Sequence, residues 1–264
     1  MIKDVRTFIL DSDPFVRNWI ALLLARDWRT HYVGEAGSIP DFDIILKNEQ
    51  PNINVVFLRD TIAADDVLFK QYKQALAVIP HDVLTIMTGL QVNDQALKQL
   101  QQSFIAGYLI KEEIRDSIVW AATMATSSKW VVTPSVQDAI FHTGYYPPGK
   151  GIVMDGRINI ANLSPREIEA ARMAFLFSLE RHDLADELNI SNDWSYGLVS
   201  SIYKKLGLTE IIEGEVDPAT YLGSNELLQA HLKEIVSELN GSPKAKDIET
   251  LAFHVFTMPE IVAF

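Results

Sequence analysis

The sequence predicts an α/β fold with a doubly wound parallel sheet, followed by an all-α region. Over the first half of the chain, short apolar runs alternate with longer amphipathic runs, which is typical of strands separated by helices. Residues 145–151 then contain two prolines and two glycines, which exclude a helix or a central strand. We therefore expect a domain boundary between about 140 and 162, with helices beyond it.

Four apolar runs predict the buried strands of the sheet: Val5–Leu10, Asn54–Leu58, Val83–Met87 and Gly107–Ile110. The amphipathic stretches predict helices at Pro14–Arg26, Asp94–Phe104 and Ile114–Met124. In parallel sheets of this kind, function gathers at the carboxyl ends of the strands. The residues found at these ends are Asp11, Ser12, Asp13, Arg59, Asp60, Thr88 and Lys111.

Three short motifs resemble the receiver domain of bacterial response regulators. They are DSDPFVR at 11–17, Thr88-Gly89 and GYLIK at 107–111, which match the acidic turn, the hydroxyl switch and the strand-end lysine of that family. The resemblance covers residues 1–125 and implies a CheY-like, five-stranded parallel sheet. TSSKWVVTP at 126–134 resembles the segment that ends many LuxR/FixJ-type receivers, so residues 126–162 are expected to form a linker.

Phosphorylation of an aspartate requires a carboxylate beside a divalent metal that further acids hold. The resemblance places Ser12 where a second acid is expected and Arg59 where the nucleophile is expected. A guanidinium cannot be phosphorylated, and we expect Arg59 to pair with Asp11 as an internal cation that removes the need for metal. The remaining pocket residues are then structural relics or a fixed switch: Asp13, Thr88, Tyr108 and Lys111.

An alternative makes Asp60 the phosphate acceptor through a slip of one residue. Neighbouring strand residues point to opposite faces, so this slip requires a bulge to re-aim the side chain. Ile62-Ala63 fall where the family usually has Met-Pro when Arg59 sets the register, which favours Arg59 at the nucleophile position.

The second module opens with LSPRE at 163–167 and closes with KKLG at 204–207. Ser164, Pro165 and Glu167 form the pattern of a capping box at a helix start. Helices are expected at 182–191 and 194–208, and residues 163–208 resemble the LuxR/FixJ (NarL)-type helix-turn-helix. This resemblance implies a DNA-binding recognition helix.

The expected DNA face carries few basic residues. The candidate groove contacts are Ser195, Tyr196, Ser200 and Lys204, supported by Lys205 and by Arg166 and Arg172 on the first helix. Few neutralised phosphates give weak, salt-dependent binding. The alternative is a helix-turn-helix kept for packing or dimerisation, with Trp194 and Leu198 against a partner.

Residues 209–264 form an acidic extension with 3 basic and 10 acidic residues, a net charge of −7 within a total of −12. Amphipathic helices are expected at Ser224–Asn240 and about Lys246–Val255. His231 lies on the apolar stripe without a partner at metal-binding spacing and is read as a packed residue. The extension is expected to dimerise, to fold over the helix-turn-helix or to recruit a partner.

These patterns favour an atypical, phosphorylation-independent response regulator that acts in transcription. The expected partners are duplex DNA and a protein or a second copy, with homodimerisation through the last receiver helices or the extension. The alternative is an interaction adaptor that has lost DNA binding, and a third class is a small-molecule sensor at the receiver pocket. We expect no enzyme activity, because no nucleophile, base and oriented third residue are brought together by these patterns. We also expect no cofactor and no metal. The chain has no cysteine, no signal pattern and no long apolar run, so we expect a cytoplasmic protein without a membrane partner.

Overall fold

The computed structural model describes residues 4–126, 130–156, 163–217, 226–239 and 245–263. The chain divides into two units, each described by itself. Unit 1 contains Met1–Gly156 and Pro259–Phe264, and unit 2 contains Arg157–Met258. Unit 2 is thus inserted in the sequence of unit 1, whose last residues follow it.

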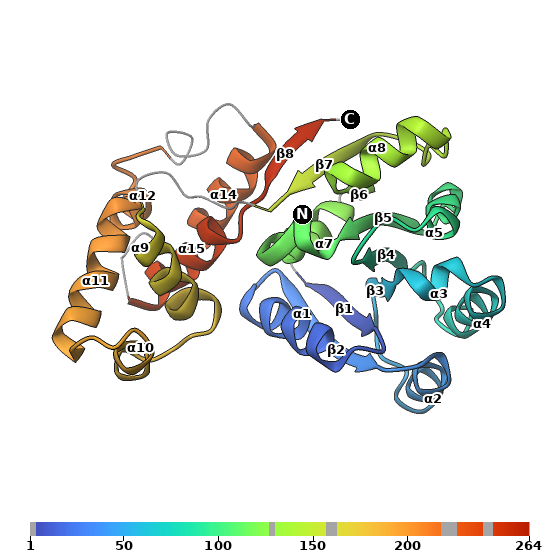
Figure 1. Ribbon diagram of the computed structural model, residues 1–264, viewed down its shortest axis with the longest axis horizontal. Helices are drawn as coiled ribbons and strands as arrows, with labels where there is room; N and C mark the ends of the chain where they lie inside the picture. Colours follow the sequence, from blue (N-terminus) through green and yellow to red (C-terminus); the bar gives the residue numbers. More distant parts are fainter. Residues whose placement is uncertain (1–3, 127–129, 157–162, 218–225, 240–244, 264) are drawn as a thin grey trace. The chain divides into compact units, whose positions relative to one another are not determined.

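Unit 1 is built on an eight-stranded sheet with the order β2-β1-β3-β4-β5-β6-β7-β8 (Figure 1). Its strands are β1 Val5–Leu10, β2 Thr30–Ala36, β3 Val55–Arg59, β4 Leu84–Gly89, β5 Ile105–Ile110, β6 Trp130–Val132, β7 Gly151–Asp155 and β8 Glu260–Ala263. All neighbouring pairs from β2 to β7 are parallel, and β8 pairs with β7 in the antiparallel direction. The predicted doubly wound α/β fold is confirmed.

Helices cover both faces of this sheet. The helical elements of unit 1 are α1 Pro14–Arg26, α2 Ile39–Glu49, α3 Asp60–Ala64, α4 Asp66–Leu76, α5 Asp94–Lys98, η1 Gln99–Gln101, α6 Lys111–Ile114, η2 Arg115–Ser117, α7 Ile118–Ala125 and α8 Pro134–Thr143. Helices α1 and α7 pack together on one face, and α2, α3, α4, α5 and α8 form a connected layer on the other. Pro14 opens α1 directly after its cap Asp13, as expected.

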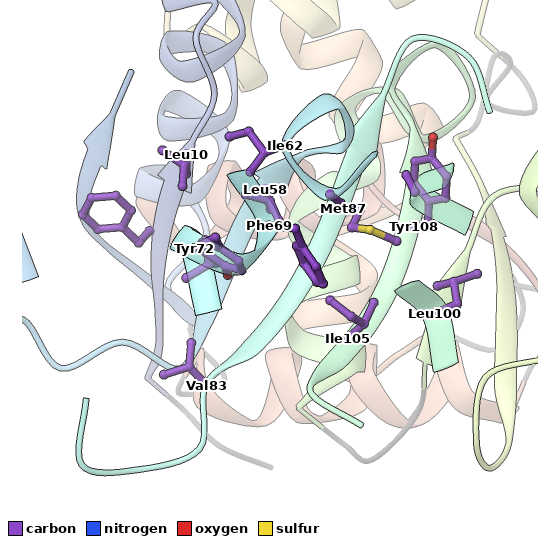
Figure 2. Close-up of a cluster of buried hydrophobic side chains, with 14 of the residues drawn as sticks. Leu10, Leu58, Ile62, Phe69, Tyr72, Val83, Met87, Leu100, Ile105 and Tyr108 are labelled. Carbon is purple, nitrogen blue, oxygen red and sulfur yellow. The ribbon is translucent and has the colours of Figure 1, made fainter. Parts of the chain in front are cut away.

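The main core lies between the sheet and the second helical layer (Figure 2). Side chains from the strands, including Leu10, Leu58 and Met87, meet Phe69 and Tyr72 of α4 there. The β3 run Val55–Leu58 is at most 1% exposed along its length, which explains its continuous apolar sequence. This core holds the strand ends in fixed register.

The prediction of a linker at residues 126–162 is wrong for most of this range, which forms two strands and a helix. Residues Trp130–Val132 and Gly151–Asp155 extend the sheet as β6 and β7, with α8 between them. These two apolar runs bury themselves by pairing beside β5, and with β8 from the end of the chain the sheet has eight strands rather than five. Residues 127–129 and 157–162 lie outside the described residues.

Helix α7 offers no surface for the expected dimerisation through the last receiver helices. All 8 of its residues are buried, from Ile118 to Ala125. A helix that is apolar all round is a core helix, so α7 itself presents no side chain for self-association.

Unit 2 is helical. Its elements are α9 Pro165–Ala171, the π-helical turn η3 Arg172–Leu176, α10 Arg181–Glu187, α11 Asn192–Lys205, α12 Leu208–Ile212, α14 Glu226–Glu238 and α15 Ala245–Phe256. The capping box of Ser164 and Glu167 is present at the start of α9. The buried Leu228, Leu232 and Ile235 form the apolar stripe of α14, and His231 on the same stripe is also buried.

The acidic extension 209–264 is not helical to its end. Its last described residues form β8, which belongs to the sheet of unit 1. The last helix ends at Phe256, and after Pro259 the apolar Ile261 and Val262 lie in the strand. No helix in the described ranges is long and apolar enough to cross a membrane.

Candidate functional site

The predicted strand-end residues of unit 1 come together at one edge of the sheet. In the parallel register, Leu10 pairs with Leu58 and Arg59 pairs with Thr88. Asp11 follows β1 directly, and Lys111 follows β5 as the first residue of α6. Because the strands are parallel, their carboxyl ends present these side chains to the same cleft.

Asp11 is the centre of this site and is 1% exposed. The Lys111 ammonium lies 2.7 Å from its Oδ2, and the Arg59 guanidinium lies 3.4 Å from its Oδ1. The backbone N–H of Asp13 donates to Oδ1 at 2.9 Å, while the Asp13 carboxylate caps α1 through Phe15 N. The buried charge of Asp11 is therefore compensated by two cations and a backbone donor.

Arg59 also donates to the hydroxyl of Ser12. Its side chain is 34% exposed, and it reaches from the end of β3 across to the end of β1. Hard divalent cations such as Mg²⁺ and Ca²⁺ are bound by oxygen ligands. The side chains here do not fit such a cation, because the Asp11 carboxylate is engaged by the Lys111 ammonium and the Arg59 guanidinium.

Asp60 lies on another side of the site. It is the first residue of α3 and 7% exposed, and it accepts a hydrogen bond from the Tyr108 hydroxyl at 2.8 Å. Its carboxylate lies against Gly89, where a Cβ atom would collide with it. Burial raises the pKa of Asp60, against the opposing effects of Tyr108 and the nearby cations.

The Tyr108 hydroxyl ties Asp60 to the loop after β4. It accepts from the backbone N–H of Asn93 at 2.9 Å and also lies 3.2 Å from the Gln91 carbonyl. Burial raises the pKa of Tyr108, as does the Asp60 carboxyl. Thr88 is 1% exposed and Tyr108 is 0% exposed, so these two side chains are buried and only Asp60 of the three lines the cleft.

The cleft has a volume of about 420 Å³. Its polar lining contains both acids and cations, and its apolar lining comes from Val16 and the loop after β4. The residues that line the cleft are Asp13, Val16, Arg59, Asp60, Thr61, Gly89, Leu90, Gln91, Val92, Asn93 and Lys111. Among the residues that the structure describes, no group of three or more His, Cys, Asp or Glu is placed to hold a metal ion.

The second candidate surface is the outward face of α11 in unit 2. Tyr196, Ser200 and Lys204 are exposed, at a spacing that places them on one side of the helix. Trp194 is 54% exposed and Tyr196 is 61% exposed. Gly197 follows Tyr196 directly, and nothing lies within 4 Å of where its Cβ would be.

Ser195 was expected to face DNA, and this expectation is wrong. Its side chain is 0% exposed, and its hydroxyl lies 2.8 Å from the Arg181 carbonyl and 2.7 Å from the Asn192 carbonyl. It shares the buried face of α11 with Val199 and Ile202, at i, i+4 and i+7. This spacing is visible in the sequence and could have predicted the burial.

The candidate basic residues of unit 2 differ in their contacts and in their exposure to solvent. The Lys205 ammonium lies 2.8 Å from the Glu167 carboxylate and holds the pKa of Glu167 below its usual value. The Arg166 guanidinium lies 5.2 Å from the centre of the Trp194 ring and donates to the Leu188 carbonyl. Arg172 is exposed at the start of η3, and Lys204 is exposed on the outward face of α11.

The solved structures to which the chain is similar include response regulators. One is the RcsB response regulator of Salmonella typhimurium, at 19% identity and a TM-score of 0.44, covering 78% of this chain and 93% of that chain. Another is an RcsB–DNA complex, at 19% identity and a TM-score of 0.45, covering 77% and 92%. A third is the response regulator ChrA of a heme-sensing two-component system, at 23% identity and a TM-score of 0.38, covering 78% and 91%.

No protein-family model matches the chain, and no curated protein matches it. Similarity at this level does not establish a shared function, which must come from the residues of the site.

Some site residues were not predicted from the sequence. The loop residues Gln91 and Asn93 line the cleft, and Arg17 donates to the Asp11 carbonyl at 2.7 Å while pairing with Glu35 at 2.9 Å. Arg17 belongs to the DSDPFVR motif, so its place one turn after the acidic residues was a usable signal. The loop after β4 has no such motif.

The raised pKa of Asp60 predicts a pH dependence of stability. The folded state binds this proton more tightly than the unfolded chain does, so the contribution to the free energy of unfolding is largest below the unfolded pKa near 3.8. It falls as the pH rises through the folded pKa. Asp60→Asn lacks this titration, so the stability of the native protein relative to this variant should decline with rising pH across that window.

Urea unfolding at a series of pH values measures this difference. Asp66→Asn, at an exposed carboxyl on α4, is the matched control for the loss of one negative charge. A constant difference between the native protein and Asp60→Asn from pH 3 to 7, by contrast, would refute the burial effect.

Proposed function

We propose that the protein is an atypical response regulator that works without phosphorylation and regulates transcription through its divergent helix-turn-helix. The observation that carries the first part is the engagement of Asp11 by Lys111 and Arg59. A guanidinium occupies the place of a phosphate acceptor and supplies positive charge to the buried acid. The pocket is therefore electrically compensated without a metal ion or a phosphoryl group.

The alternative acceptor Asp60 is poorly placed for attack on a phosphodonor. Its carboxylate is buried against Gly89, and Tyr108 donates a hydrogen bond to one of its oxygens. Its raised pKa also lowers the fraction of the nucleophilic carboxylate at a given pH. These features favour a structural role for Asp60 at the start of α3.

The output part of the proposal is supported by the outward face of α11. Tyr196, Ser200 and Lys204 offer hydrogen-bond donors and one cation, and Gly197 allows a close approach to the helix backbone. A helix in the major groove needs side chains of this kind for base edges and phosphates. With few free cations on this face, we expect weak binding that depends strongly on salt.

Fluorescence anisotropy of labelled duplex DNA with the full-length protein, over a series of salt concentrations, tests this role. Lys204→Ala should weaken binding and reduce the slope of log affinity against log salt by about 0.9, the value for one phosphate contact. The matched control is Lys98→Ala, at an exposed lysine of unit 1. An equal effect of both substitutions, or no binding at low salt, would remove DNA binding from the proposal.

A second candidate function is a protein-interaction adaptor, favoured by the exposed aromatic pair of α11. Trp194 and Tyr196 are more than half exposed, which is unusual for large aromatic residues and typical of interface anchors. Trp194 and Tyr196 are two residues apart on α11 and lie on different sides of the helix, so only Tyr196 belongs to the outward face. If this face binds a second copy, sedimentation equilibrium should show a dimer that Tyr196→Ala weakens. A monomer at all accessible concentrations contradicts self-association through this face.

A further inference from the structure

Unit 2 is joined to unit 1 at two neighbouring points of the sheet. The chain leaves unit 1 after Asp155 and Gly156 at the end of β7, and it returns at Pro259 and Glu260 at the start of β8. Asp155 pairs with Glu260 in the antiparallel register. Both covalent connections are therefore held together by the end of one short strand pair, which we call the β7–β8 clasp.

The clasp packs against the short helix α6. The backbone N–H of Gly156 donates to the Glu113 carbonyl at 2.7 Å. A Cβ atom on Gly156 would lie 2.5 Å from the Ile114 carbonyl oxygen, so only glycine permits this approach. The position of α6 and the position of the chain at Gly156 are thus directly linked.

The other end of α6 belongs to the strand-end site. Its first residue is Lys111, whose ammonium lies 2.7 Å from Asp11. Helix α6 has 4 residues and is followed by its cap Arg115, whose φ of 48° is unfavourable for a residue with a side chain. The Glu113 carboxylate accepts from the backbone N–H of Ser135 at 3.2 Å, which ties α6 to the start of α8.

The clasp also carries an unfavourable charge arrangement. Asp155 and Glu260 are like charges directly opposite each other, which destabilises a strand pair. Glu113 of α6 adds a third carboxylate nearby, and burial together with these two acids raises the pKa of Asp155. Arg115 is the cation that opposes this effect. Helix α6 thus contributes one of the three acids beside this end of the strand pair and also holds Gly156 through the Glu113 carbonyl.

We propose that α6 couples the Asp11–Lys111 ion pair to the β7–β8 clasp, so that loosening the ion pair releases the two points where the chain enters and leaves unit 2. The site in unit 1 would thereby control the two chain connections at the β7–β8 clasp through the packing of α6. This proposal does not depend on whether unit 2 binds DNA or protein.

Hydrogen exchange measured by mass spectrometry on the full-length protein tests the coupling. Lys111→Met should loosen the Lys111 end of α6 and raise exchange at least about fivefold at Gly156 and at residues 260–263. Lys98→Met, which removes an exposed lysine elsewhere in unit 1, should leave these amides unchanged. Faster exchange confined to the site around Asp11, with the clasp unchanged, would overturn the proposal.

The reciprocal substitution provides a second, independent measurement. Gly156→Ala forces α6 away from the clasp and should raise exchange at the Asp13 amide, which donates to the Asp11 carboxylate. An unchanged Asp13 amide in a folded Gly156→Ala protein would also overturn the proposal. If this variant does not fold, the Lys111→Met measurement decides.

Discussion

Arg59→Asp is expected to create a Mg²⁺ site in unit 1. The substitution places a carboxylate at the end of β3, beside the buried Asp11 and next to Asp13. Without metal, the close acids repel each other and lower the free energy of unfolding. With Mg²⁺ at about tenfold above its dissociation constant, binding to the folded state should restore about 1.4 kcal/mol.

Thermal unfolding with and without Mg²⁺ measures this effect, and Ca²⁺ serves as a second hard cation. Arg59→Met is the matched control, because it removes the guanidinium without adding a ligand. The native protein and this control should show no Mg²⁺-dependent shift in Tm. A Mg²⁺-dependent rise in the Tm of the native protein would contradict the view that Arg59 replaces the metal.

Asp27→Ala is expected to give the largest loss of stability among substitutions in unit 1. The side chain of Asp27 is 0% exposed and that of Arg29 is 3% exposed, and they are joined by a bond of 2.6 Å between Arg29 Nη2 and Asp27 Oδ2. Arg29 also lies over Trp120 of α7, at 4.2 Å from its ring centre. Removing Asp27 leaves a buried guanidinium without its carboxylate, which costs about 3–5 kcal/mol.

Urea unfolding followed by circular dichroism measures this loss. Asp43→Ala is the matched control, because its ion pair with Lys47 is exposed and should contribute about 0–0.5 kcal/mol. The double variant Asp27→Ala with Arg29→Met removes both charges and should regain part of the stability. A loss below about 1 kcal/mol for Asp27→Ala would show that the buried Arg29 guanidinium does not depend on the Asp27 carboxylate.

The predicted fold follows from local patterns wherever the strands are long and apolar. Strands β1, β3, β4 and β5 coincide with the four apolar runs of the sequence, because a strand buried on both faces must be apolar throughout. Strand β2, with the sequence THYVGEA, was not recognised as an apolar run. Its pairing with β1 supplies the stability that its local sequence does not show.

The site was predicted best where its residues follow strands directly. Asp11, Arg59 and Lys111 meet as the parallel topology requires, and the expected ion pair of Arg59 with Asp11 is present. The resemblance to a recognition helix places Ser195 at the DNA face, whereas the helical periodicity of α11 places it on the buried face with Val199 and Ile202. The ion pair of Lys205 with Glu167 joins α11 to α9, and the sequence around either residue does not predict this long-range contact.

The sequence by itself determined the parallel α/β architecture, the helix starts capped by Asp13 and Ser164, and a basic residue, Arg59, at the end of β3. Those features depend on hydrophobic periodicity, on capping and on residue identity. The tertiary structure alone decided that β6, β7 and β8 extend the sheet and that unit 2 is inserted between adjacent strands. Strands of three to five residues carry little periodicity, and β8 pairs with a strand about 100 residues earlier, so only long-range packing can select that partner.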